Sequence, residues 1–173
     1  MLPFVSGIRQ GEAYEDVRYA IKHLSRASLW VKDEAEKTFE AKIIGLLQGT
    51  TRLRKKLISQ IDDEEEKIIS ADLFSFKHYP DASIDDTIAI EIKVVSQHEG
   101  PRIRELLGQA LVYRFKYKFV VLVLVDRTDD HKIVKACKKK NSDENNLLKS
   151  LSEDYNIFTL VGPVYGKNKN MVF

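Results

Sequence analysis

The chain has 173 residues, 43% of them hydrophobic and 31% charged, with a net charge of +2 at pH 7. These values are typical of one folded domain over 1–173, and they argue against a disordered chain. The small net charge does not by itself indicate a nucleic-acid partner. Cys137 is the only cysteine, which excludes an internal disulfide and fits a reducing compartment. We therefore expect a cytoplasmic protein, and the longest apolar run is too short to cross a membrane.

The first third of the chain predicts two helices. Residues 14–29 carry apolar side chains at helical spacing, and residues 30–47 repeat that spacing. The segment 52–67 that follows is basic first and acidic afterwards. Its pattern fits an exposed helix or a loop equally well.

Strand patterns begin at Ile68. The segments 68–76 and 81–84 each predict a strand, and 87–95 predicts the clearest one because it is rich in β-branched residues. Turn residues separate these segments, so we expect an antiparallel meander.

The second half of the chain predicts alternating helices and strands. A helix with a wide apolar stripe begins near Pro101. The nearly all-apolar segment 119–125 predicts a strand that is buried on both faces. A C-terminal region of helix and strand completes the chain, with helices at 130–140 and 145–151 and a strand at 156–161. This order predicts an α/β protein with a central mixed sheet flanked by helices.

The strand over 87–95 carries two charged residues in an otherwise apolar pattern. Glu91 and Lys93 are two positions apart, so they project from the same face of the strand. A surface ion pair on an exposed sheet face would explain these two residues alone. Asp81, however, begins the preceding strand, and a hairpin would bring its carboxylate beside Glu91. Mg²⁺ needs one or two such carboxylates, and a lysine beside it can orient or deprotonate water.

Pro80-Asp81, nine residues and then Glu91-Ile92-Lys93 resemble the motif of the PD-(D/E)xK nuclease superfamily, which has a restriction-endonuclease-like core. Gln109 and Tyr113 on the next helix resemble the QxxxY motif of its RecB-type branch. The resemblance covers about 34–125, in the order α-β-β-β-α-β. It implies a Mg²⁺-dependent deoxyribonuclease that also accepts Mn²⁺. The alternatives are an inactive DNA-binding or assembly protein that keeps the nuclease fold, and an unrelated α/β binding domain.

In this superfamily a Glu from the helix before the hairpin often completes the site. Glu40 fits that position, Glu36 lies one turn earlier, and Glu64, Glu65 or Glu66 could act instead. The implied catalytic residues are Glu40, Asp81, Glu91, Lys93, Gln109 and Tyr113, with Asp81 and Glu91 as the metal ligands.

Basic residues in two places are candidates for binding DNA phosphates. For either group taken alone, ordinary solvated surface is the first interpretation. The candidates are Arg52, Arg54, Lys55, Lys56, Arg102 and Arg104. Small nucleases of this kind often act as homodimers, so we expect a homodimer. The sequence does not distinguish an endonuclease from an exonuclease, nor does it indicate which DNA is recognised.

Overall fold

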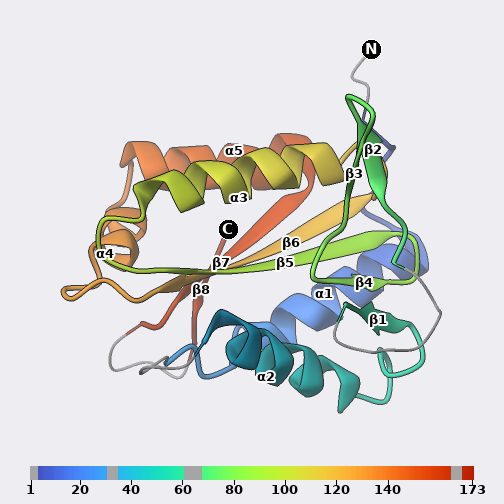
Figure 1. The fold of residues 1–173 in the computed structure, drawn as a ribbon, viewed down its shortest axis with the longest axis horizontal. Helices are drawn as coiled ribbons and strands as arrows, with labels where there is room; N and C mark the ends of the chain where they lie inside the picture. Colours follow the sequence, from blue (N-terminus) through green and yellow to red (C-terminus); the bar gives the residue numbers. More distant parts are fainter. Residues whose placement is uncertain (1–3, 31–34, 61–67, 165–168) are drawn as a thin grey trace.

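The computed structural model describes residues 4–30, 35–60, 68–164 and 169–173. A mixed six-stranded sheet lies between two layers of helices (Figure 1). This arrangement confirms the predicted α/β class with a central mixed sheet. Two helices cover one face of the sheet and three lie on the other. The first face is covered by α1 (Gly11–Leu24) and α2 (Glu36–Gln48). The other face is covered by α3 (Gly100–Tyr113), α4 (Lys132–Lys138) and α5 (Asp143–Tyr155).

The strand order in the sheet is β1-β4-β5-β6-β7-β8. The three central strands β5, β6 and β7 are parallel, and the outer strands run antiparallel to their neighbours. The strands are β1 (Leu57–Ser59), β4 (Ala82–Ile84), β5 (Ile88–Val95), β6 (Phe119–Asp126), β7 (Ile157–Gly162) and β8 (Met171–Val172). A separate hairpin is formed by β2 (Ala71–Leu73) and β3 (Phe76–His78).

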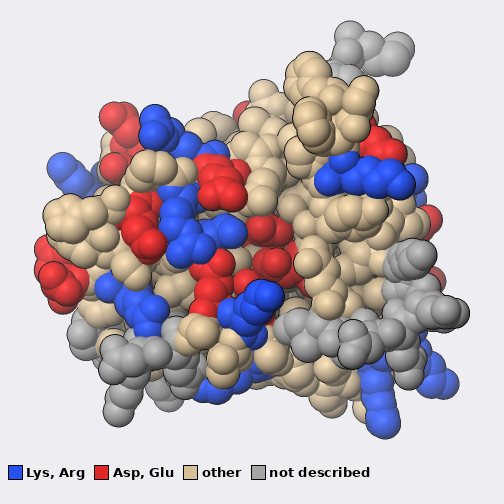
Figure 2. Space-filling model, in the orientation of Figure 1, with Lys and Arg blue, Asp and Glu red and all other residues tan. Residues whose placement is uncertain are grey.

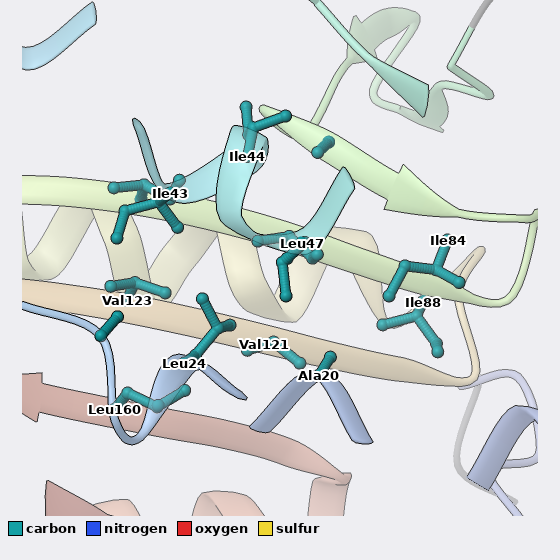
Figure 3. Packing of buried hydrophobic residues seen from close by; sticks show 14 of the residues in the cluster. Ala20, Leu24, Ile43, Ile44, Leu47, Ile84, Ile88, Val121, Val123 and Leu160 are labelled. Atoms are coloured by element: carbon teal, nitrogen blue, oxygen red, sulfur yellow. The ribbon is translucent and has the colours of Figure 1, made fainter. Parts of the chain in front are cut away.

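The core has two halves because helices cover both faces of the sheet. The even-numbered side chains of β5 face α1 and α2, as Figure 3 shows for Ile88. Odd-numbered residues such as Ala89 and Val95 pack with α3 and α5. The half toward α1 and α2 includes Ala20, Leu24, Ile43, Leu47, Ile84, Ile88, Val121, Val123 and Leu160. The alternation of β5 therefore decides which side chains reach the α3 layer.

The prediction of one strand over 68–76 was wrong. A turn at Phe74 and Ser75, with φ angles of 51° and 65°, divides this segment into a hairpin. Left-handed backbone at a non-glycine residue has no strong sequence signal, so the turn was missed. The expected meander is also different, because β1 rather than this segment pairs with β4.

All five helices were predicted, but their ends differ by up to about six residues: the second was expected to begin at 30 and begins at Glu36, since periodicity locates a helix better than it locates its ends. The strand β1 was not predicted, because the segment 52–67 was expected to be a helix or a loop, and the short C-terminal strand β8 was also not predicted. Among the described residues, none of the helices is both long and apolar enough to cross a membrane.

Candidate active site

The site lies where the pairing of β4 with β5 stops and β5 continues without a partner on that edge. β4 pairs with β5 only as far as Ile90, and no described strand pairs with this edge of β5 beyond that point. Two carboxylates accept the backbone N–H groups that a strand would otherwise bind. Asp81 Oδ2 accepts from Ile92 N at 2.7 Å, and Glu36 Oε2 accepts from Val94 N at 3.0 Å. The open edge of the sheet therefore gathers negative charge.

Glu91 projects from β5 toward α3 and is only 3% exposed. Its Oε2 lies 3.1 Å from the Tyr113 hydroxyl, which is also 3.0 Å from the Tyr79 carbonyl. The Tyr113 hydroxyl has one proton, so it can donate to only one of these two acceptors at a time. A protonated Glu91 would satisfy both contacts, by donating to Tyr113 while Tyr113 donates to Tyr79.

Lys93 lies on the same side of β5 as Glu91, as the alternation of the strand predicted. Its Nζ is 3.9 Å from Glu91 Oε1 and 3.8 Å from Glu36 Oε1. The Lys93 side chain is only 12% exposed. The interpretation of this pair as solvated surface is therefore wrong, because both charges are largely enclosed.

The carboxylates of the site share an environment that disfavours their charged forms. Burial raises the pKa of Glu91 to about 8, and the negative charge of Asp81 adds to this shift. Burial also raises the pKa of Asp81, against the hydrogen bond from Ile92. For Glu40, burial followed by the charges of Asp81 and Glu36 raises the pKa to about 7. Figure 2 shows acidic side chains close together near the middle of this face of the protein. A bound cation would relieve this excess of negative charge.

Both candidate carboxylates of α2 reach the site. Glu40 interacts with the charge of Asp81. Glu36 is held by the backbone N–H of Val94 and by Arg102. The Nη2 atom of Arg102 lies 2.8 Å from Oε1 and 2.7 Å from Oε2 of Glu36. The Arg102–Glu36 pair was missed because the two residues are distant in the sequence. The other candidates, 64–66, lie outside the described residues.

Gln109 lies one turn before Tyr113 on α3. Its Oε1 is buried and has no hydrogen-bond partner in the described part of the protein. A buried acceptor without a donor is costly, so this atom fits a site that holds a further polar group. The described residues contain no group of three or more His, Cys, Asp or Glu arranged to hold a metal. Asp81 and Glu91 with waters form the smaller set that Mg²⁺ accepts, so these residues fit that ion.

The predicted DNA-binding residues are dispersed. Arg102 lies at the site but is paired with Glu36. Arg104 is exposed on α3. The run 52–56 lies beside the β4–β5 turn, where Asp85 N donates to Lys56 O, at the opposite end of β5 from Lys93.

Within that run, two of the basic side chains have a structural role. Arg52 and Lys56 both pair with Asp16 of α1, which is 2% exposed. Arg54 and Lys55 are exposed and remain candidates for phosphate contacts.

No protein-family model matches this chain. Searches of curated proteins and of solved structures likewise give no match. The geometry of the site therefore carries the functional argument.

Proposed function

We propose that this protein is a Mg²⁺-dependent deoxyribonuclease with a PD-(D/E)xK-type site. The observation that carries the proposal is the convergence of Asp81, Glu91 and Lys93 at the unpaired edge of β5. Two desolvated carboxylates beside one enclosed ammonium group suit a divalent cation and a phosphate. When bound, Mg²⁺ supplies activation of water and neutralisation of phosphate charge, and Mn²⁺ can replace it.

The side chains of the site have distinct roles in this proposal. Asp81 and Glu91 hold the metal, and Glu40 or Glu36 adds a carboxylate from α2. Lys93 orients the attacking water by donating a hydrogen bond to its oxygen, and it stabilises the negative charge that develops on the phosphoryl oxygens. This arrangement supports hydrolysis of a phosphodiester bond.

Two residues of α3 support these groups. Tyr113 fixes Glu91 through its hydroxyl. Gln109 offers a buried amide whose free acceptor can bind a water. Such support matters because small displacements of a catalytic group lower the rate strongly.

DNA is the substrate that the resemblance implies. The exposed basic residues Arg54, Lys55 and Arg104 are available to bind phosphates. The alternative is a protein that binds DNA with this fold but does not cut it, and a cleavage assay separates the two.

The test is incubation of the purified protein with linear, circular and branched DNA in Mg²⁺ or in chelator. We expect cleavage with Mg²⁺ alone, and a decrease of roughly 100-fold or more in Glu91→Gln and Lys93→Ala. Glu105→Gln is a matched control, because Glu105 is an exposed carboxylate on α3. Cleavage of circular DNA would identify an endonuclease. Parent protein that binds DNA in Mg²⁺ and leaves it intact would favour the inactive alternative.

A further inference from the structure

The β2–β3 hairpin carries aromatic side chains out of the body of the protein. It lies outside the six-stranded sheet and projects from it (Figure 1), and its end forms an uncharged projection in Figure 2. Phe74 is 85% exposed, Phe76 is 70% exposed and Tyr79 is 45% exposed. Side chains this exposed contribute little to the core. Two of them on one short hairpin, with Tyr79 directly after it, indicate a contact surface.

The base of this hairpin is fixed although its tip is free. An isolated two-stranded hairpin is marginally stable in water. Here Ala71 is buried with residues of α3, and the Tyr117 hydroxyl donates to the Ile69 carbonyl. The Tyr113 hydroxyl contacts the Tyr79 carbonyl at the other end. The exposed rings are therefore held on a structured support.

The hairpin leads directly into the candidate active site. Asp81 follows Phe76 by five residues, which span at most about 18 Å when fully extended. That length corresponds to roughly five nucleotide steps at the spacing of a stacked strand in duplex DNA. Lys77, which is exposed on β3, places a positive charge beside the aromatic residues. A nucleic acid whose phosphate occupies the site can therefore reach the hairpin.

The chemistry of phenylalanine restricts what it can bind in DNA. Its ring has no hydrogen-bonding group, so it binds neither phosphate nor the polar atoms of a base edge. It stacks on base faces. In a duplex these faces are covered by neighbouring bases, so a ring reaches them only by unstacking a step, which costs about a few kcal/mol. An unpaired strand exposes base faces that Phe74 and Phe76 can contact.

We propose that Phe74 and Phe76 stack on unpaired bases, so that the substrate of this site is single-stranded DNA. This inference rests on the proposed nuclease function and names its substrate class. Phe74, Phe76 and Tyr79 are exposed and follow one another along the chain between the hairpin tip and Asp81. The DNA strand would run from the hairpin to the carboxylates at the edge of β5.

The test compares a labelled thymidine oligonucleotide with a blunt duplex of the same length, by fluorescence anisotropy in chelator. We expect the parent to bind the single strand more tightly. The double variant Phe74→Ala/Phe76→Ala should weaken this binding roughly 5- to 100-fold and leave duplex binding unchanged. Phe74→Tyr/Phe76→Tyr should restore it, because the rings return. Leu147→Ala is the control, since Leu147 is a 47% exposed apolar residue on α5.

Three results would overturn the inference. They are equal binding of both DNAs by the parent, no difference between the double variant and Leu147→Ala, and conversion of a dimer to a monomer by the double variant in sedimentation. The last result would assign the hairpin to a contact between two copies. Since the chelator prevents cleavage, a parent that binds single strands through these rings but never cuts DNA refutes only the nuclease function.

Discussion

Asp81 Oδ2 accepts the backbone N–H of Ile92 at 2.7 Å, at the point where β5 loses its neighbour β4. A side chain thus satisfies an edge amide that a strand carbonyl would otherwise bind. This contact aims Asp81 at the site and keeps the edge of β5 from pairing further. The same residue therefore has a structural role and a proposed chemical role, which substitution can separate.

Asp81→Asn should separate these two roles. The asparagine carbonyl can still accept from Ile92, whereas its lack of charge removes a metal ligand. In the parent, Mg²⁺ at about 100 times its Kd should raise the melting temperature by roughly 5–10 °C. The variant should melt near the parent without metal and show little of this rise. A thermal scan with and without Mg²⁺ checks this, and an equal rise in both proteins would contradict Asp81 as a ligand.

The raised pKa of Glu91 makes the stability of the metal-free protein depend on pH. Burial raises this pKa from 4.5 to about 8, so the folded state binds the proton more tightly than the unfolded state does. The stabilisation is fully present below pH 4.5 and is lost as the pH rises through 8. The loss should be of the order of a few kcal/mol. Glu91→Gln should remove much of this dependence and melt higher than the parent at pH 9.

Urea unfolding in chelator at pH 6 and pH 9 measures that effect. Glu105→Gln serves again as the control, because it removes an exposed carboxylate and leaves the buried one in place. A parent as stable at pH 9 as at pH 6 would mean that Glu91 is already ionised in the folded protein.

Tyr113→Phe should weaken both the fold and the site. The change removes the hydroxyl that contacts Glu91 and the Tyr79 carbonyl, and Tyr113 is only 1% exposed. We expect a loss of about 1 kcal/mol in the free energy of unfolding, because a buried hydrogen bond is removed. DNA cleavage should fall by more than this loss explains, since Glu91 is no longer fixed. Cleavage at the parent rate would show that Tyr113 serves only the core.

Two neighbouring lysines should differ in their effect on stability. Lys56 Nζ lies 2.7 Å from Asp16, whose carboxylate is buried, whereas Lys55 is exposed. Lys56→Ala should leave Asp16 with fewer partners and lower the free energy of unfolding by roughly 1–3 kcal/mol. Lys55→Ala should change it by less than about 0.5 kcal/mol. Denaturant unfolding of both variants checks this, and equal stabilities would place Lys56 on plain surface.

The alternation of 87–95 determined much of the site without any tertiary information. A strand has a period of two, so Glu91 and Lys93 had to share a face wherever β5 lay. The same argument applies to α3, where the spacing of Gln109 and Tyr113 places both on one side of a helix. These relationships are local and depend only on backbone geometry.

Only the tertiary structure decided which groups from distant parts of the chain join these residues of β5 and α3 in the site. Glu36 reaches Val94 and Arg102 because α2 packs across the sheet beside the open edge of β5, and no local spacing encodes that position. The turn at Phe74 that builds the aromatic hairpin is equally invisible in the sequence, since its left-handed backbone contains no glycine. Periodicity determines which residues share a face of one helix or strand. Packing and burial determine which of these faces contact one another and which charged groups are desolvated.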